Sequence, residues 1–410
     1  MGIFRKTVME VNRSAGHWVT GMSVVVLLAG CTRPAEPAAA GRTVDSTVSA
    51  SVAAAGATQG VRLDLLPFPE PSGGGLAVAQ QQALQAALDQ VTQPWASGVI
   101  DGVTVAVVTP DGSWAGATGT DGDDVPLVPE AMADIASITK TVTAAEVVSL
   151  AQAGLIDLNA PASTYLDHPL LDRDPTIREL LSHTSGVPEH TTNAFITAVL
   201  ADPTRTWTPQ EALAYATGPT TDPGRPVLDY SNSNYVLLGL IIEKITGLSY
   251  TEAIRRDVLA GLVGRMALQT GETPSPPLAA PDRSTGAVPD GLFLPNRALA
   301  SAAGAAGGIA ADAPTLATWG YRLYGGLILP PERTVELATP VASGYGLGTM
   351  IVPGLAGPDL FVGHFGGING YSTQLIVDPT RRLSIAVLTV GTGGPALDDL
   401  IKHILTTLAT

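Results

Sequence analysis

The stretch Ser137-Ile-Thr-Lys-Thr-Val-Thr-Ala-Ala-Glu-Val-Val-Ser-Leu-Ala-Gln-Ala153 places a lysine three residues after a serine, at the start of a long apolar segment. Gly154 follows as a helix stop, so the segment predicts a buried helix. Residues three apart share a helix face, which lets the Lys140 amine reach the Ser137 hydroxyl. Burial favours the neutral amine, and a neutral amine can deprotonate a serine. Alone, the motif is common, and Ser137 could equally be a helix N-cap.

Two further polar clusters occur later in the chain. Tyr230-Ser-Asn232 precedes a predicted helix, so the tyrosine hydroxyl could relay a proton and the asparagine could bind a substrate. A packed tyrosine and a capping asparagine are the alternative. His364-Phe-Gly-Gly367 lies in or at the end of a predicted strand, where glycines let a substrate backbone approach closely. A strand histidine with its hydrogen bonds satisfied is the alternative for His364.

The order of the predicted elements indicates the fold class. Strands at both ends of the catalytic region and helices between them predict an α+β fold, with a mostly antiparallel sheet flanked by helices and an inserted helical lobe. A cleft between the two parts is a natural place for a site. The predicted strands are 103–109, 113–119, 345–352, 360–365, 372–377 and 383–390, and the predicted helices are 76–91, 137–153, 232–246, 250–262 and 397–408.

The N-terminal region predicts export. Residues 1–30 combine a basic start with a short apolar run and end in Leu28-Ala-Gly-Cys31, which looks like the lipobox of bacterial lipoproteins. We expect a signal peptide over 1–30, a flexible Ala/Gly/Pro-rich tether over 31–75 and one catalytic domain over 76–410. The protein would then be lipid-anchored to the bacterial cell membrane through Cys31. An ordinary signal peptide with an incidental cysteine is the alternative.

Composition excludes several classes of function. The 410 residues are 45% hydrophobic and 14% charged, which supplies a large core and argues against wholesale disorder. A net charge of −15 repels phosphate backbones, so we expect no nucleic-acid partner. The six histidines show no metal-ligand spacing, and the single cysteine has no partner, so we expect neither a metal nor a cofactor. No G-x-S-x-G elbow occurs, which disfavours a conventional α/β-hydrolase.

Together the motifs resemble the serine β-lactamase and DD-peptidase family, in particular the branch that holds class C β-lactamases, DD-carboxypeptidases, D-aminopeptidases and related esterases. The resemblance covers roughly residues 76–410. It rests on Ser137-x-x-Lys140, Tyr230-x-Asn232 and His364-Phe-Gly-Gly367 in that order, with support from residues 176–186, 230–235, 304–312, 345–348 and 363–371.

The resemblance implies a role for each motif residue. Ser137 would be acylated, Lys140 would be the base and Tyr230 would assist proton transfer. Asn232 would contact the substrate, and the N–H groups of Ser137 and Gly367 would form the oxyanion hole. His183, which is tempting as a triad member, belongs in the resembling motif to a structural turn, so we expect a core or loop role for it.

One departure from the family pattern bears on the substrate. His364 takes the place usually held by the lysine of a K-T-G motif, and Phe365 stands where a Thr or Ser commonly binds a substrate carboxylate. Phenylalanine offers no donor and adds bulk, and a neutral histidine reduces the positive charge. We therefore expect a serine hydrolase acting through an acyl-enzyme on esters or amides that lack a C-terminal carboxylate.

Two alternatives stay open. The first keeps the chemistry and makes the protein a D-alanyl-D-alanine carboxypeptidase or a β-lactamase, with a cell-wall peptide or another small molecule as substrate. The second is a catalytically silent binding lipoprotein on the same fold.

Overall fold

The computed structural model describes residues 65–91, 100–224, 227–262, 264–353, 360–391 and 395–408. The predicted signal peptide, Cys31 and most of the predicted tether lie outside these residues. Among the helices described, none is long and apolar enough to cross a bilayer.

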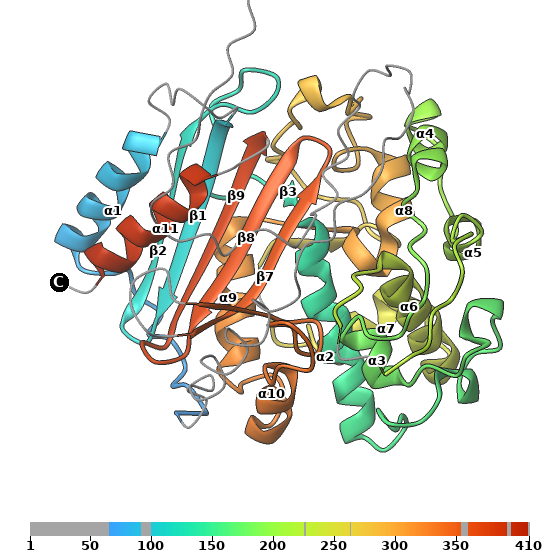
Figure 1. The fold of residues 1–410 in the computed structure, drawn as a ribbon. Coiled ribbons are helices and arrows are strands. Elements are labelled where there is room, and N and C mark those ends of the chain that lie inside the picture. Colours follow the sequence, from blue (N-terminus) through green and yellow to red (C-terminus); the bar gives the residue numbers. More distant parts are fainter. Residues whose placement is uncertain are drawn as a thin grey trace, which may run out of the picture.

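A six-stranded antiparallel sheet joins the two ends of the catalytic region, as predicted (Figure 1). Its order is β2-β1-β9-β8-β7-β6, so the last four strands extend the hairpin formed by the first two. Val107 of β1, for example, lies opposite Trp114 of β2 and Ile385 of β9. The strands are β1 Ile100–Thr109, β2 Gly112–Gly119, β6 Met350–Pro353, β7 Leu360–Ile368, β8 Tyr371–Asp378 and β9 Leu383–Gly391.

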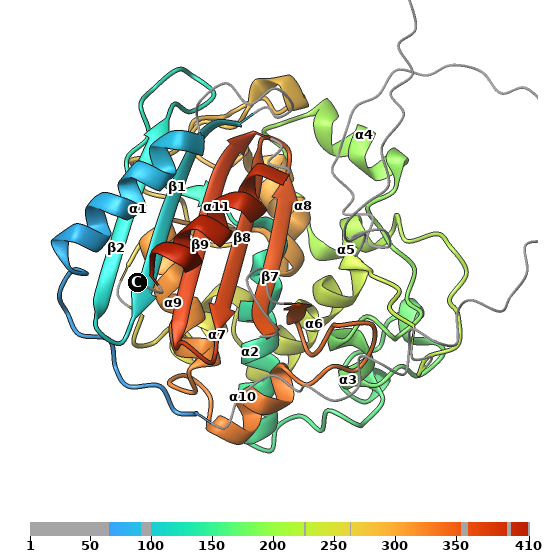
Figure 2. The ribbon, with the colours of Figure 1, turned by 60° about the vertical axis from the view of Figure 1, so that its left-hand side comes forward.

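Helices cover both faces of this sheet. The terminal helices α1 (Val78–Val91) and α11 (Pro395–Thr407) lie side by side across one face, where Leu84 and Ile401 belong to a buried apolar cluster with strand side chains (Figure 2). Helix α9 (Ala313–Tyr324) packs against the other face. The sheet is therefore buried on both sides, which explains why all nine residues of β9 are buried.

The middle of the chain forms the helical part beside the sheet. Its core helix α2 follows the short 3-10 turn η1 (Ala136–Ile138), and α6 and α8 pack against it. The helices of this part are α2 Thr139–Gln152, α3 Ile177–Leu181, α4 Asn193–Ala201, α5 Pro209–Leu213, α6 Asn232–Thr246, α7 Tyr250–Arg256 and α8 Arg297–Gly307, and α10 Pro331–Leu337 follows α9. The remaining 3-10 turns are η2 Ala162–Thr164, η3 Pro169–Leu171 and η4 Arg283–Thr285.

Several predicted boundaries were wrong, and one small sheet was not predicted. The predicted helix 250–262 ends at Arg256, and the predicted strand 345–352 begins only at Met350, because Gly348 adopts a left-handed φ of 64° that interrupts an extended chain. A second small sheet, ordered β3-β5-β4, was not predicted. Its strands Ala133–Asp134, Met266–Leu268 and Ile309–Ala311 are too short to show a period of two.

Candidate active site

Ser137 lies in the 3-10 turn η1 and not in the first turn of an α-helix, as the sequence had suggested. The preceding Ala136 has a φ of 48°, a conformation that is uncommon for a residue other than glycine. Its N–H donates to Asp134 Oδ1 at 2.6 Å, and Gln269 donates to the other carboxylate oxygen at 3.1 Å. This buried support offsets the backbone strain and holds the serine at the entrance of α2.

Lys140 Nζ lies within hydrogen-bonding distance of three oxygens from three parts of the fold. Its Nζ lies 3.0 Å from Ser137 Oγ, 2.8 Å from Asn232 Oδ1 and 2.7 Å from the backbone oxygen of Ala306. The side chain is fully buried, and this burial lowers the pKa of the amine to about 7, although the negative charge of Glu189 acts in the opposite direction. At neutral pH a large fraction of Lys140 is therefore an unprotonated amine next to the serine hydroxyl.

Tyr230 completes the group around the serine. Its hydroxyl is hydrogen-bonded to Ser137, while burial raises its pKa above the ordinary value of 10. The ring stacks on His183, with the ring centroids 4.1 Å apart. His183 is itself buried, which confirms the expected core role. Near pH 7 Tyr230 therefore keeps its proton, and of the two groups only Lys140 is available in an unprotonated form that can act as base towards Ser137.

A carboxylate that the sequence did not single out lies behind this cluster. Glu189 Oε2 accepts hydrogen bonds from the backbone N–H of Asn232 at 2.7 Å and from its side-chain amide at 3.0 Å. Because the amide nitrogen of Asn232 faces Glu189, its oxygen is turned towards Lys140. Glu189 follows the turn 182–188 and belongs to no spaced motif, so only the three-dimensional structure identifies it.

His364 lies in the same region, but its side chain is buried and both of its ring nitrogens have hydrogen-bond partners. It is about 1% exposed, its Nε2 lies 2.9 Å from the hydroxyl of Tyr345, and its Nδ1 lies 2.6 Å from the backbone oxygen of Phe365. Burial lowers the pKa of the imidazole to about 3, so the ring carries no charge at neutral pH. These contacts hold His364 against Tyr345 and β7, and its expected contact with a substrate stays a prediction.

The partly buried Phe365 side chain lies on the sheet face that α1 and α11 cover. Successive residues of a strand point to opposite faces, and the Phe365 ring packs into the cluster under α1 and α11, together with Phe361. It therefore adds no bulk on the face that Ser137 occupies. A contact between Phe365 and a substrate stays a prediction, and a phenylalanine at this position supplies no hydroxyl.

The glycines after Phe365 allow β7 to pass against the turn that carries the nucleophile. A Cβ on Gly366 would lie 2.4 Å from the backbone oxygen of Ile135 and 3.1 Å from the Ala136 side chain. Any larger residue would push β7 away from η1. Gly367 follows on the same strand, beside the segment that holds Ser137, so the two proposed oxyanion donors come from neighbouring elements.

Known proteins share parts of this sequence. A family model described as Beta-lactamase matches residues 87–408. The Putative penicillin-binding protein PbpX of Bacillus subtilis is 27% identical over 226 residues, which is 54% of each chain. Protein flp of Staphylococcus aureus is 36% identical over 138 residues, which is 32% of this chain and 26% of that protein. The chain thus spans about a quarter to a half of the length of these curated relatives.

Solved structures share the fold over a larger part of the chain. A D-stereospecific amidohydrolase from Streptomyces sp. has a TM-score of 0.65 and 26% identity, and the match covers 79% of this chain and 97% of the other. The D-amino acid amidase from Ochrobactrum anthropi SV3 has a TM-score of 0.68 and 23% identity, with 81% and 99% covered.

Proposed function

The chain belongs to the beta-lactamase family, and on that premise we propose that it is a serine hydrolase which cleaves amides or esters through an acyl-enzyme at Ser137. The observation that carries the proposal is the contact between Lys140 Nζ and Ser137 Oγ at 3.0 Å, made by a lysine whose pKa is lowered to about 7. A base with a pKa near the working pH is the kind that general-base catalysis favours.

The proposed steps follow from these contacts. Neutral Lys140 takes the proton from Ser137 Oγ as the oxygen attacks the substrate carbonyl carbon. The resulting oxyanion would be stabilised by the N–H groups of Ser137 and Gly367. The proton then passes from Lys140, with help from the Tyr230 hydroxyl, to the leaving nitrogen or oxygen. Water repeats the attack on the acyl-serine, releases the carboxylic acid and restores the free serine.

The charges around the site favour particular substrates. A substrate with a C-terminal carboxylate would find an uncharged His364 and no hydroxyl at Phe365, and it would be repelled by the half-buried carboxylate of Glu189. An acyl group that carries a free amine would be attracted by the same carboxylate. We therefore propose amides or esters of amino acids as substrates, which agrees with the names of the two amidohydrolases of the same fold.

The experiment is a labelling reaction combined with a substrate panel. A fluorophosphonate should add one label per chain, at Ser137, by intact mass and peptide mapping. Amino acid amides and short aryl esters should then be hydrolysed faster than nitrocefin or an acyl-D-Ala-D-Ala peptide. Labelling at another serine would refute the nucleophile, and faster turnover of nitrocefin would refute the substrate class.

The two alternative functions make different predictions. Similarity to the penicillin-binding protein PbpX favours a carboxypeptidase or β-lactamase, which would be acylated by penicillin in the intact-mass assay. A silent binding protein would show neither label nor turnover while remaining folded. The hydrogen bonds that join Ser137, Lys140 and Tyr230 argue against this last function, because a binding role does not need all three.

We also propose that Cys31 is lipidated and that the exported enzyme is anchored through it to the bacterial cell membrane. The support is the lipobox-like sequence 28–31. Cys31→Ser should release the protein from the membrane fraction or leave it with an uncleaved signal sequence. Unchanged partitioning and unchanged mass of this variant would refute the anchor.

A further inference from the structure

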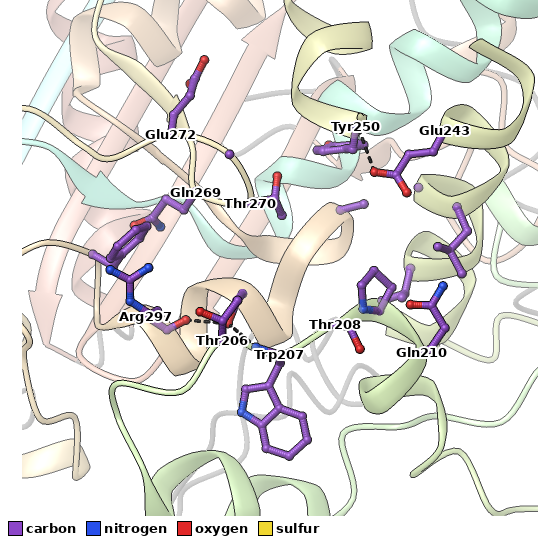
Figure 3. A pocket seen from close by; sticks show the side chains of 18 of the residues that line it. Thr206, Trp207, Thr208, Gln210, Glu243, Tyr250, Gln269, Thr270, Glu272 and Arg297 are labelled. Atoms are coloured by element: carbon purple, nitrogen blue, oxygen red, sulfur yellow. Dashed lines mark hydrogen bonds between the residues drawn. The ribbon is translucent and has the colours of Figure 1, made fainter. Parts of the chain in front are cut away.

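A cavity lies beside α6 and α8, the two helices that supply hydrogen-bond acceptors to Lys140. It has a volume of about 520 Å³, within the range of roughly 300–1,000 Å³ that is typical of small-molecule sites. Its walls come from α6, α7, α8, the start of α5 and the segment 269–273 (Figure 3). Neither Ser137, Lys140, Tyr230 nor Asn232 lines it, so it is separate from the candidate active site.

Two charged side chains of opposite sign line this cavity. Neither forms an ion pair within the part of the chain that the structure describes. Arg297 lies 4.2 Å from the Phe293 ring centroid, and no carboxylate pairs with its guanidinium. Glu243 accepts a hydrogen bond from the backbone N–H of Tyr250 at 2.9 Å, and no cation pairs with it. By contrast, Glu272 is bound by both Nε and Nη2 of Arg255, at 2.8 and 2.7 Å, so its charge is already compensated.

The arrangement of these charges identifies a ligand class. In Figure 3, Arg297 and Glu243 project from opposite sides of the pocket, and Thr206, Thr270 and Gln210 lie around the same space. Arginine is the residue best suited to bind a carboxylate through two parallel hydrogen bonds. A half-buried carboxylate such as Glu243 suits an ammonium group. One unmatched cation and one unmatched anion on opposite walls match a molecule that carries both charges.

We propose that this cavity is a second ligand site, which binds a free amino acid or a dipeptide in its zwitterionic form. Arg297 binds the carboxylate, Glu243 binds the ammonium group, and the apolar walls at Val236 and Leu240 receive a side chain. The ligand belongs to the chemical class expected around an enzyme that cleaves amino acid amides, but the proposal does not depend on that activity.

The walls of the cavity also provide a route to the catalytic lysine. Ala305 lines the cavity, and the backbone oxygen of its neighbour Ala306 accepts the hydrogen bond from Lys140. Tyr250, another lining residue, hydrogen-bonds through its hydroxyl to Thr143, which in turn donates to the backbone oxygen of Ala305, both at 2.7 Å. A ligand that shifts this part of α8 would therefore change the hydrogen bonding of Lys140.

Titration calorimetry on the full chain tests the site. The probe is the dipeptide Ala-Ala, compared with its N-acetylated form, its C-terminal amide and the doubly capped form. The Ser137→Ala variant serves as host, so that no turnover interferes. The zwitterion should bind, and each cap should weaken binding by about tenfold or more, because each removes one charged hydrogen-bonding group.

Substitutions locate the binding. Arg297→Gln and Glu243→Gln should each weaken binding of Ala-Ala by about tenfold or more, whereas Arg173→Gln, at an exposed arginine elsewhere, should leave it unchanged. Melting temperatures of the three variants show whether the fold is retained. Acylation of wild type with a fluorophosphonate should not block binding of Ala-Ala, because the two sites share no residue, although a shift in affinity is compatible with the route through α8. Absence of binding at millimolar dipeptide, equal binding of the capped forms, or competition by the fluorophosphonate would each overturn the proposal.

Discussion

Helix α2 buries one ionisable side chain near its N-terminal end and another at its middle, and the two behave differently. Lys140, near the N-terminal end, has three hydrogen-bond acceptors and a pKa lowered to about 7. Glu146 lies six residues further along, and burial, helped by the nearby Asp257, raises its pKa to about 9. Burial pushes both groups towards the neutral form. The difference is that Lys140 faces a nucleophile and can change its protonation state near neutral pH, whereas Glu146 stays protonated inside the core.

The largest expected effect is at the nucleophile. Ser137→Ala should abolish acylation by a fluorophosphonate and reduce ester turnover to background. Because the residues of such a unit act together, the double variant Ser137→Ala/Lys140→Ala should lose little more activity than Ser137→Ala alone. Steady-state kinetics on one ester measures both. Full activity in Ser137→Ala would show that the chemistry lies elsewhere.

Tyr230→Phe should give the next largest effect. The substitution removes only the hydroxyl that bonds to Ser137 and keeps the ring stacked on His183. We expect kcat to fall by roughly a hundred- to ten-thousand-fold, the usual contribution of a proton-transfer group. The melting temperature should stay close to that of wild type. Tyr215→Phe, at a tyrosine packed against Phe195 and Trp207, is the matched control and should keep its activity.

The fold was easier to predict from the sequence than the site. The large sheet and the helices α1, α6 and α11 were predicted correctly, because the apolar residues of these elements follow regular periods. The motif spacing correctly predicted the contact between the Ser137 and Lys140 side chains, since the two residues are only three positions apart. The features of the site that the sequence did not show depend on long-range packing. Glu189 belongs to no spaced pattern, and the orientation of Phe365 depends on the register of β7 against β8.

The pH dependence of activity tests the N-terminal end of α2 more finely. Only the neutral form of Lys140 can accept the serine proton, so kcat/KM should rise with pH through a midpoint near 7. Glu189 holds that pKa up through its charge, so Glu189→Gln should move the midpoint to lower pH. Glu130→Gln, an exposed control, should not move it. A midpoint that stays in place in Glu189→Gln would show that the titrating group is not Lys140.

The smallest expected effect is at the middle of α2, where Glu146 lies, and it concerns stability alone. The pKa of Glu146 is about 9 in the folded protein, against an ordinary value of 4.5. Between these values the folded state binds more protons than the unfolded state, so this residue favours folding at acid pH and loses that contribution as the pH rises towards 9.

Glu146→Gln removes the titration and keeps nearly the same shape, so the variant should lose less stability than wild type between pH 5 and pH 8. Thermal melts at these two values measure the difference, which we expect to be a few degrees in melting temperature. Glu130→Gln again serves as the exposed control. Since Glu146 touches none of the catalytic residues, the kcat/KM profile should be unchanged. A shift of that profile in Glu146→Gln would show that the two buried positions of the helix are coupled and that the contrast between them is incomplete.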